Sequence, residues 1–171
     1  MDAWANLGRN GNLLETKIED KDMNKLIEKK VYDIWCDRWE IERHSSEYGS
    51  VKTSLENWYW TRSKNRQVDV QLTRLKLRGV NLNKYLNRIG ASDTDLCQKC
   101  TLQQPEDVNH FLIQCPAYRN ERDILKNNLR TIGIYNIDTN ILLGSSNYEI
   151  DIKKIITKEL AKFLKATKRL Y

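Results

Sequence analysis

Apolar residues recur at three- and four-residue steps through most of the chain, which is the spacing of amphipathic helices. The pattern begins near Asp22, and charged side chains fill the opposite face of this first segment. Its apolar face requires a partner surface and comprises Met23, Leu26, Ile27, Val31, Ile34, Trp35 and Trp39. The polar stretch at positions 44–50 that follows predicts a loop.

Five further segments show the same helical spacing. They cover positions 68–79, 82–89, 105–115, 118–130 and 151–168. Asn81 and Pro105 favour helix starts, whereas Gly90 and Gly133 favour helix ends. The run Ile141–Leu143 predicts a short apolar link. With only seven glycines and two prolines in 171 residues, a turn-rich all-β plan is disfavoured, and we predict an all-α fold.

Three of the four cysteines and one of the two histidines fall within a 19-residue window. Cys97 and Cys100 enclose two residues, nine residues then precede His110, and four more precede Cys115. Two cysteines at this spacing can bind one metal ion from a tight turn, and a His and a Cys from the next element complete a tetrahedron. We therefore predict a zinc ion held by Cys97, Cys100, His110 and Cys115, in a small helical domain that this site staples together.

Two other interpretations of these thiols stay open at this stage. Cys97 and Cys100 could form a disulfide, or the cysteines could be ordinary buried thiols. The first residues contain no apolar stretch of a secretory signal, and no segment has the roughly 18 apolar residues of a membrane span. We therefore expect an intracellular protein, nuclear or cytoplasmic, in which clustered Cys and His favour a metal. Four protein ligands leave no open position, so the metal is expected to be structural, and Cys36 and His44 are not needed as ligands.

Positive charge is concentrated in one part of the chain. The formal net charge is +6, and positions 58–90 carry eight basic residues against the single acid Asp69, which gives +7 there and about −1 elsewhere. Such a local field suits phosphate binding, although a charged stretch can also be a solvated face. Aromatic and basic residues alternate at its start, which is typical of surfaces that stack on bases, although Trp58 and Trp60 could equally belong to the core. The candidate nucleic-acid contacts are Trp58, Trp60, Arg62, Lys64, Arg66, Arg74, Lys76 and Arg78.

Several of these motifs occur together in one known family. The chain resembles the zinc-binding region at the C-terminus of non-LTR (LINE-type) retrotransposon polyproteins, which lies downstream of the reverse transcriptase. The resemblance is strongest from about residue 66 to residue 125 and extends to the closing run at 163–170. The motifs are Leu72-Thr-Arg-Leu75, Leu82–Gly90, Cys97-x-x-Cys100 and His110–Tyr118. One departure is that Val80 follows Gly79, where family members usually carry a Gly-His pair.

The N-terminus resembles the tail of retroelement RNase H domains. Asp2 is followed three residues on by Ala5 and six residues on by Gly8, so by this resemblance Asp2 would be the last metal-binding carboxylate of an RNase H site. A lone carboxylate cannot hold two catalytic Mg²⁺ ions. We thus expect positions 1–20 to be a remnant tail and positions 21–171 to form the helical zinc-binding domain.

The resemblance implies a binding role without catalysis. We expect a module that helps a polyprotein engage RNA or DNA in target-primed reverse transcription. The alternative is a structural module that docks on the reverse transcriptase or RNase H portion of the parent polyprotein. No glycine-rich phosphate loop, Ser/His/acid set or paired carboxylates accompany the zinc window, so we expect no enzymatic activity. We also expect no membrane partner.

Overall fold

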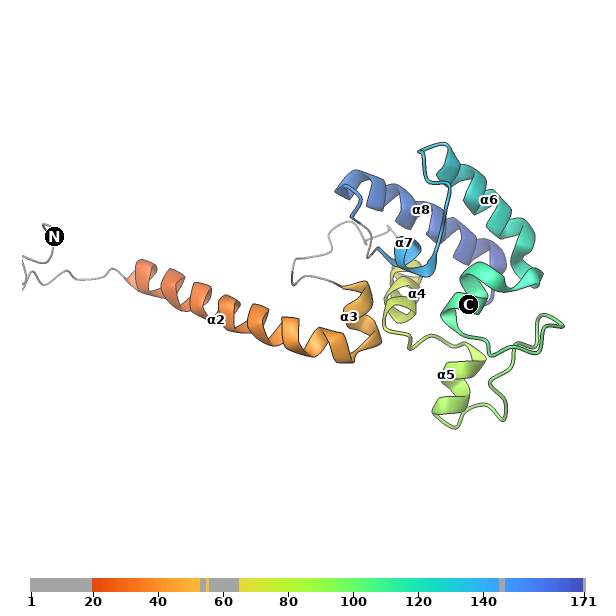
Figure 1. The fold of residues 1–171 in the computed structure, drawn as a ribbon, viewed down its shortest axis with the longest axis horizontal. Coiled ribbons are helices and arrows are strands. Elements are labelled where there is room, and N and C mark those ends of the chain that lie inside the picture. The colour runs from red at the N-terminus through yellow and green to blue at the C-terminus, as the bar shows by residue number, and fades with distance from the viewer. Residues whose placement is uncertain (1–19, 53–54, 56–64, 145–146, 171) are drawn as a thin grey trace, which may run out of the picture. The chain divides into compact units, whose positions relative to one another are not determined.

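The computed structural model describes residues 20–52, 55, 65–144 and 147–170, and within these ranges every regular element is a helix (Figure 1). The all-α prediction is therefore confirmed for this part of the chain. By its internal contacts the chain divides into two units, Met1–Arg38 and Trp39–Tyr171. The predicted tail at positions 1–20 lies almost entirely outside the described residues.

Helix α2 (Asp20–Glu42) contributes all the described residues of the first unit. It begins close to the predicted start, and Asp20 and Asp22 lie in its first turn, where the helix dipole favours acids. None of its residues is buried. The predicted apolar face exists as a stripe but stays exposed, as the 58% exposure of Leu26 and the 63% exposure of Trp35 show.

Two short helices follow α2 where a loop was predicted. These are the single 3₁₀ turn η1 (Arg43–Ser45) and helix α3 (Glu47–Val51). The Ser46 hydroxyl accepts a hydrogen bond from the Gly49 N–H at 3.0 Å and so caps α3. At Gly49 an added Cβ would lie 2.0 Å from the carbonyl oxygen of Arg43, so only glycine allows this tight reversal. The loop prediction was wrong because local capping, and not apolar periodicity, forms these turns.

The remaining helices all belong to the second unit. They are α4 (Arg66–Lys76), α5 (Asn83–Arg88), the π-helical segment η3 (His110–Gln114), the 3₁₀ turn η4 (Pro116–Tyr118), α6 (Arg119–Arg130), α7 (Thr139–Leu143) and α8 (Ile150–Thr167). Asn65 caps α4 by accepting hydrogen bonds from two backbone N–H groups, and Asp138 caps α7 by accepting one from the Ile141 N–H. The predicted apolar link at Ile141–Leu143 is therefore helical.

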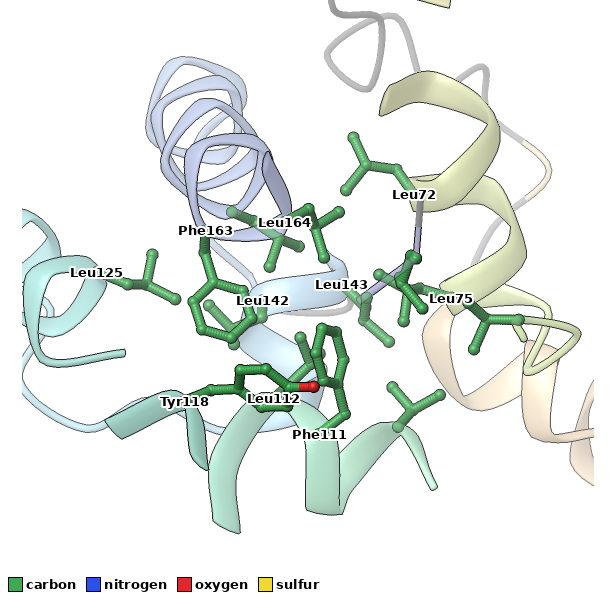
Figure 2. Close-up of a cluster of buried hydrophobic side chains, with 14 of the residues drawn as sticks. Leu72, Leu75, Phe111, Leu112, Tyr118, Leu125, Leu142, Leu143, Phe163 and Leu164 are labelled. Carbon is green, nitrogen blue, oxygen red and sulfur yellow. The ribbon is translucent and has the colours of Figure 1, made fainter. Parts of the chain in front are cut away.

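The core of this unit lies where α8 packs along α6 and also contacts α4 and α7 (Figure 2). The predicted inward positions Val68, Leu72 and Leu75 of α4 are at most 2% exposed. Phe111 lies at the centre, with its ring centroid 5.2 Å from that of Tyr118 and 5.6 Å from that of Phe163. Because Phe111 directly follows His110, the core and the cysteine–histidine window are built by the same segment.

Lys76, in the last turn of α4, is a cation inside this core region. It is only 5% exposed, and burial together with the nearby charge of Lys52 lowers its pKa to about 7. Burial disfavours the charged ammonium, so the folded protein binds fewer protons than the unfolded chain between pH 7 and 10. The contribution of Lys76 to stability therefore rises with pH across this window.

Replacing Lys76 with Met tests this conclusion. Methionine has a similar length and carries no charge, so we expect Lys76→Met to stabilise the protein at pH 7 by about 1–3 kcal/mol. The gain should shrink as the pH approaches 10, because the wild-type lysine is then neutral in both states. Denaturant unfolding of both proteins at pH 7 and pH 9.5 measures the difference. A destabilised variant at pH 7 would show that the ammonium is charged and well paired.

Candidate metal centre

The two elements that carry the cysteine–histidine window are each fixed by backbone contacts. Cys97 and Cys100 lie on a turn that is closed by an isolated antiparallel bridge between Leu96 and Pro105. The Cys97 N–H donates to the Gln104 carbonyl at 2.9 Å, which brings the ends of the turn together. Pro105 was predicted to open the next helix, but it belongs to this bridge.

Asp107 begins the helix instead of Pro105. Its carboxylate accepts a hydrogen bond from the His110 N–H at 2.8 Å, as an N-cap side chain does, and helical geometry follows directly. Lys84 also contacts Asp107 at 3.1 Å. Burial alone would raise the pKa of Asp107, but the His110 N–H, Lys84 and Arg78 together lower it. The cap is therefore a carboxylate at neutral pH and holds His110 in the first turn.

A π-helical turn then brings His110 and Cys115 to the same side. The Cys115 N–H donates to the His110 carbonyl at 2.7 Å, five residues back. An α-helix turns about 100° per residue, so it would place a residue five positions on about 140° away around the axis. The wider π turn reduces this offset, and such turns are frequent at functional sites. The apolar periodicity carries no signal for this change.

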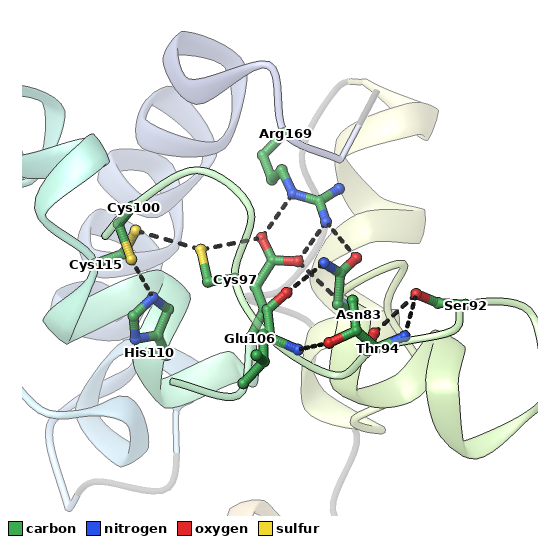
Figure 3. A network of polar contacts seen from close by, with 10 residues as sticks. Asn83, Ser92, Thr94, Cys97, Cys100, Glu106, His110, Cys115 and Arg169 are labelled. Atoms are coloured by element: carbon green, nitrogen blue, oxygen red, sulfur yellow. Dashed lines mark hydrogen bonds and ion pairs between the residues drawn. The ribbon is translucent and has the colours of Figure 1, made fainter. Parts of the chain in front are cut away.

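The four side chains meet in one compact group, as predicted (Figure 3). Their ligand atoms all lie within 4.8 Å of one another. The Sγ atoms of Cys97 and Cys115 are 3.9 Å apart, and Cys100 Sγ lies 3.4 Å from His110 Nε2. A tetrahedron with metal–sulfur bonds of about 2.3 Å and metal–nitrogen bonds of about 2.0 Å has edges of roughly 3.5–3.8 Å. The residues present thus fit one tetrahedrally coordinated metal ion.

The chemistry of the group also fits a metal ion better than a disulfide. All four cysteines of the chain are free thiols, and Cys36 is not part of the group. Burial raises the pKa of Cys97 and raises that of Cys115 to about 12, whereas it lowers the pKa of His110. The imidazole is therefore neutral, with a lone pair for a metal. The buried sulfurs become thiolates only where a cation compensates them.

A buried ion pair supports the centre from the side. Glu106 is 1% exposed, and its Oε1 lies 3.9 Å from Cys97 Sγ. Two nitrogens of the Arg169 guanidinium donate to the same carboxylate, one of them at 2.8 Å. The Asn83 N–H also donates to Glu106 Oε2, at 3.0 Å. The Asn83 side chain donates in turn to the Leu96 carbonyl at 2.6 Å. The last residues of the chain are thereby tied to the cysteine turn, as Figure 3 shows.

A second buried arginine holds the other side of the centre. Arg122 of α6 is 5% exposed and donates to the Leu112 carbonyl at 2.8 Å and the Cys115 carbonyl at 2.6 Å. These carbonyls end the π-helical segment and would otherwise be buried without donors. Arg122 therefore fixes the Cys115 backbone to α6. In contrast, His110 Nδ1 is buried with no hydrogen-bond partner in the described part of the chain, so packing sets the ring orientation.

The predicted nucleic-acid contacts are spread over several environments. Trp58, Trp60, Arg62 and Lys64 lie outside the described residues. Arg66 and Arg74 are exposed on α4, and Arg78 is half-buried just beyond its end. The burial of Lys76 does not suit a phosphate contact. Sequence reasoning missed Asn83, Glu106, Arg122 and Arg169, because their contacts cross up to 86 residues of sequence.

Comparison with known protein families, with curated proteins and with solved structures finds no match. None of the described helices is both long enough and apolar enough to cross a membrane.

Loss of one metal ligand is expected to unfold much of the second unit. Structural metal sites contribute on the order of 10 kcal/mol, which is comparable with the whole stability of a domain. We expect Cys115→Ser and His110→Ala to lower the bound metal well below one ion per chain and to abolish cooperative melting. Elemental analysis and circular dichroism measure both effects. Cys36→Ser is the matched control and should change neither, whereas native melting of the ligand variants would contradict a structural metal.

The ion pair beside the centre gives a second prediction. Arg169→Met leaves the Glu106 carboxylate buried without its partner, which costs about 3–5 kcal/mol. Adding Glu106→Gln removes the orphaned charge and should restore most of that loss. Chemical denaturation of the two single variants and the double variant measures the coupling. Additive losses would show that the two side chains contribute independently.

Proposed function

We propose that the chain is a zinc-stabilised nucleic-acid-binding module of a non-LTR retrotransposon polyprotein, which helps to hold RNA or DNA during target-primed reverse transcription. The observation that carries this proposal is the buried group of three thiols and one imidazole. Zinc is the metal that this ligand set and a tetrahedral geometry suit best. Four protein ligands leave no position for a reacting water, so the ion has a structural role.

The charge of the surrounding surface supports a nucleic-acid partner. Arg66 and Arg74 are exposed on α4, the helix that contributes Val68, Leu72 and Leu75 to the core. Arginine side chains on a rigid helix can contact phosphates without ordering the backbone, which favours binding. The family resemblance of the motifs from Leu72 to Tyr118 points to the same partner.

A second candidate function is docking on another part of the same polyprotein. Helix α2 favours it, because a 23-residue helix without a buried residue exposes an apolar stripe. Met23, Ile27 and Ile34 in this stripe are 44%, 53% and 45% exposed. A soluble domain seldom exposes such a face unless another surface covers it.

Fluorescence anisotropy with a single-stranded RNA and a single-stranded DNA distinguishes the two candidates. If about five phosphates are contacted, the slope of log K against log salt concentration should be near −3.5. Arg66→Gln with Arg74→Gln should weaken binding and reduce the slope without changing the melting temperature. The pair Lys154→Gln with Lys158→Gln on α8 is the matched control for lost charge. A flat salt response, or no binding at low salt, would reject the first function in favour of docking.

A further inference from the structure

Two helices end in a left-handed residue that is not glycine. Helices α5, α6 and α7 are followed by Gly90, Gly133 and Gly144, with φ values of 73°, 82° and 94°. Helix α4 is followed instead by Arg78 with φ 55°, and α8 by Lys168 with φ 50°. A side chain disfavours this conformation, and such strain persists mainly where the side chain has a role.

The end of α4 shows that glycine would suit the position. The Gly79 N–H donates to the Arg74 carbonyl at 3.0 Å, and the Arg78 N–H donates to the Leu75 carbonyl at 3.2 Å. These two bonds form the Schellman motif, in which the left-handed position is usually glycine. Here the chain has arginine at that position and glycine one residue later. The backbone geometry therefore gives no reason for a cation at position 78.

Arg78 lines a cavity of about 110 Å³ between the end of α4 and α5. Lys84 and Arg88 also line it, and the Arg88 guanidinium lies over the Tyr85 ring at 5.2 Å from the centroid. The two acids in the wall are already compensated. Glu106 is held by Arg169, and Asp107 contacts Lys84 at 3.1 Å. The three lining cations therefore outnumber the two lining acids by one, and Tyr85 forms an aromatic wall.

Lys168 lines a second, wider cleft of about 440 Å³ at the end of α8. Lys99, from the turn between Cys97 and Cys100, also lines it, as does Arg169, whose guanidinium is paired with Glu106. No acidic side chain lines this cleft among the described residues. The metal centre therefore positions one cation of the cleft, and the strained end of α8 positions another.

The two clefts adjoin the same ion pair. Glu106 lines the first cleft and Arg169 lines the second, and the two side chains form an ion pair beside Cys97 (Figure 3). Both clefts are concave and basic, and each is bordered by a cationic residue whose backbone is left-handed. A flexible single strand can lower its phosphates into such clefts, whereas a rigid duplex presents its backbone on a convex surface.

We infer that these two clefts bind phosphate groups of one single-stranded nucleic acid, with Arg78 and Lys168 as contacts. This inference rests on the nucleic-acid function proposed above and deepens it by naming the ligand and the contact sites. Lys84, Arg88 and Lys99 complete the two sites, and only Arg78 of these five cations was among the predicted contacts.

The test uses Arg78→Gly and Lys168→Gly in the full, metal-loaded chain. Each change removes a cation and relieves the left-handed backbone. The melting temperature should stay equal or rise by about 2–4 °C for Lys168→Gly, and should change by less than about 2 °C for Arg78→Gly, because Arg78 also attracts the Asp107 carboxylate. Each should also weaken binding of a single-stranded oligonucleotide about five-fold at about 0.1 M salt and reduce the salt slope by about 0.7. A merely structural role predicts the opposite sign for stability.

Two kinds of control sharpen the result. Arg78→Lys and Lys168→Arg keep the charge and should retain most of the affinity. Lys158→Gln removes one charge from the exposed face of α8 and should change affinity less than two-fold. A duplex of the same sequence should bind more weakly than the single strand. Competition by inorganic phosphate or by a mononucleotide at equal phosphate concentration should be weak, because neither reaches both clefts.

The outcomes separate this inference from the proposed function. If the wild-type chain binds the single strand but both glycine variants bind as tightly as Lys158→Gln, the clefts are not the contact sites and the proposed function stands. Inorganic phosphate that competes as well as the oligonucleotide would overturn the assignment to a strand. If the wild-type chain does not bind at low salt, both the inference and the proposed function are wrong.

Discussion

The convergence of three thiols and one imidazole in the interior is the constraint on which the second unit depends. Cys97 and Cys100 lie on an irregular turn, which has few apolar side chains to hold it in place. His110 and Cys115 lie on the segment that supplies Phe111 and Leu112 to the core. A cation bound at this point would therefore join a turn without its own core to the centre of the helical packing. Without a cation the same group would place polar sulfurs in the interior with little compensation.

The backbone around the centre adopts conformations that bring the four side chains together. Asp107 caps the helix one turn before the ligands, and the π turn aligns His110 with Cys115. Arg122 then satisfies the carbonyls that the π turn leaves at its end. The π turn is unfavourable for an isolated helix, because it lacks the regular bonding of an α-helix. The occurrence of these features together in one segment is explained by the geometry that the four ligands require.

Features that depend on residues close together in the sequence could be predicted, whereas features that depend on distant residues could not. The buried faces of α4, α6 and α8 repeat every three or four residues, so Val68, Leu125 and Leu160 could be assigned to the core directly. The grouping of Cys97, Cys100, His110 and Cys115 was predictable because Cys and His at these spacings have few other roles. Helix α3 and helix α7 were missed because single residues, Ser46 and Asp138, form them by capping. The Glu106–Arg169 pair was not predictable, because 63 residues separate its members and neither has a local signal.

The buried cations of this unit show how residue type follows from the partners available. Arg122 and Arg169 each meet several acceptors, carbonyls in one case and a carboxylate in the other, and their planar guanidinium groups donate to them at once. Arginine stays charged under these conditions, so the acceptors are reliably satisfied. Lys76 is buried near a second cation, Lys52, and burial together with that charge lowers its pKa, so an ammonium there can lose its proton. A basic residue in the sequence is therefore not always a basic residue on the surface. On α4 itself, Arg66 and Arg74 are exposed, whereas Lys76 on the same helix is buried.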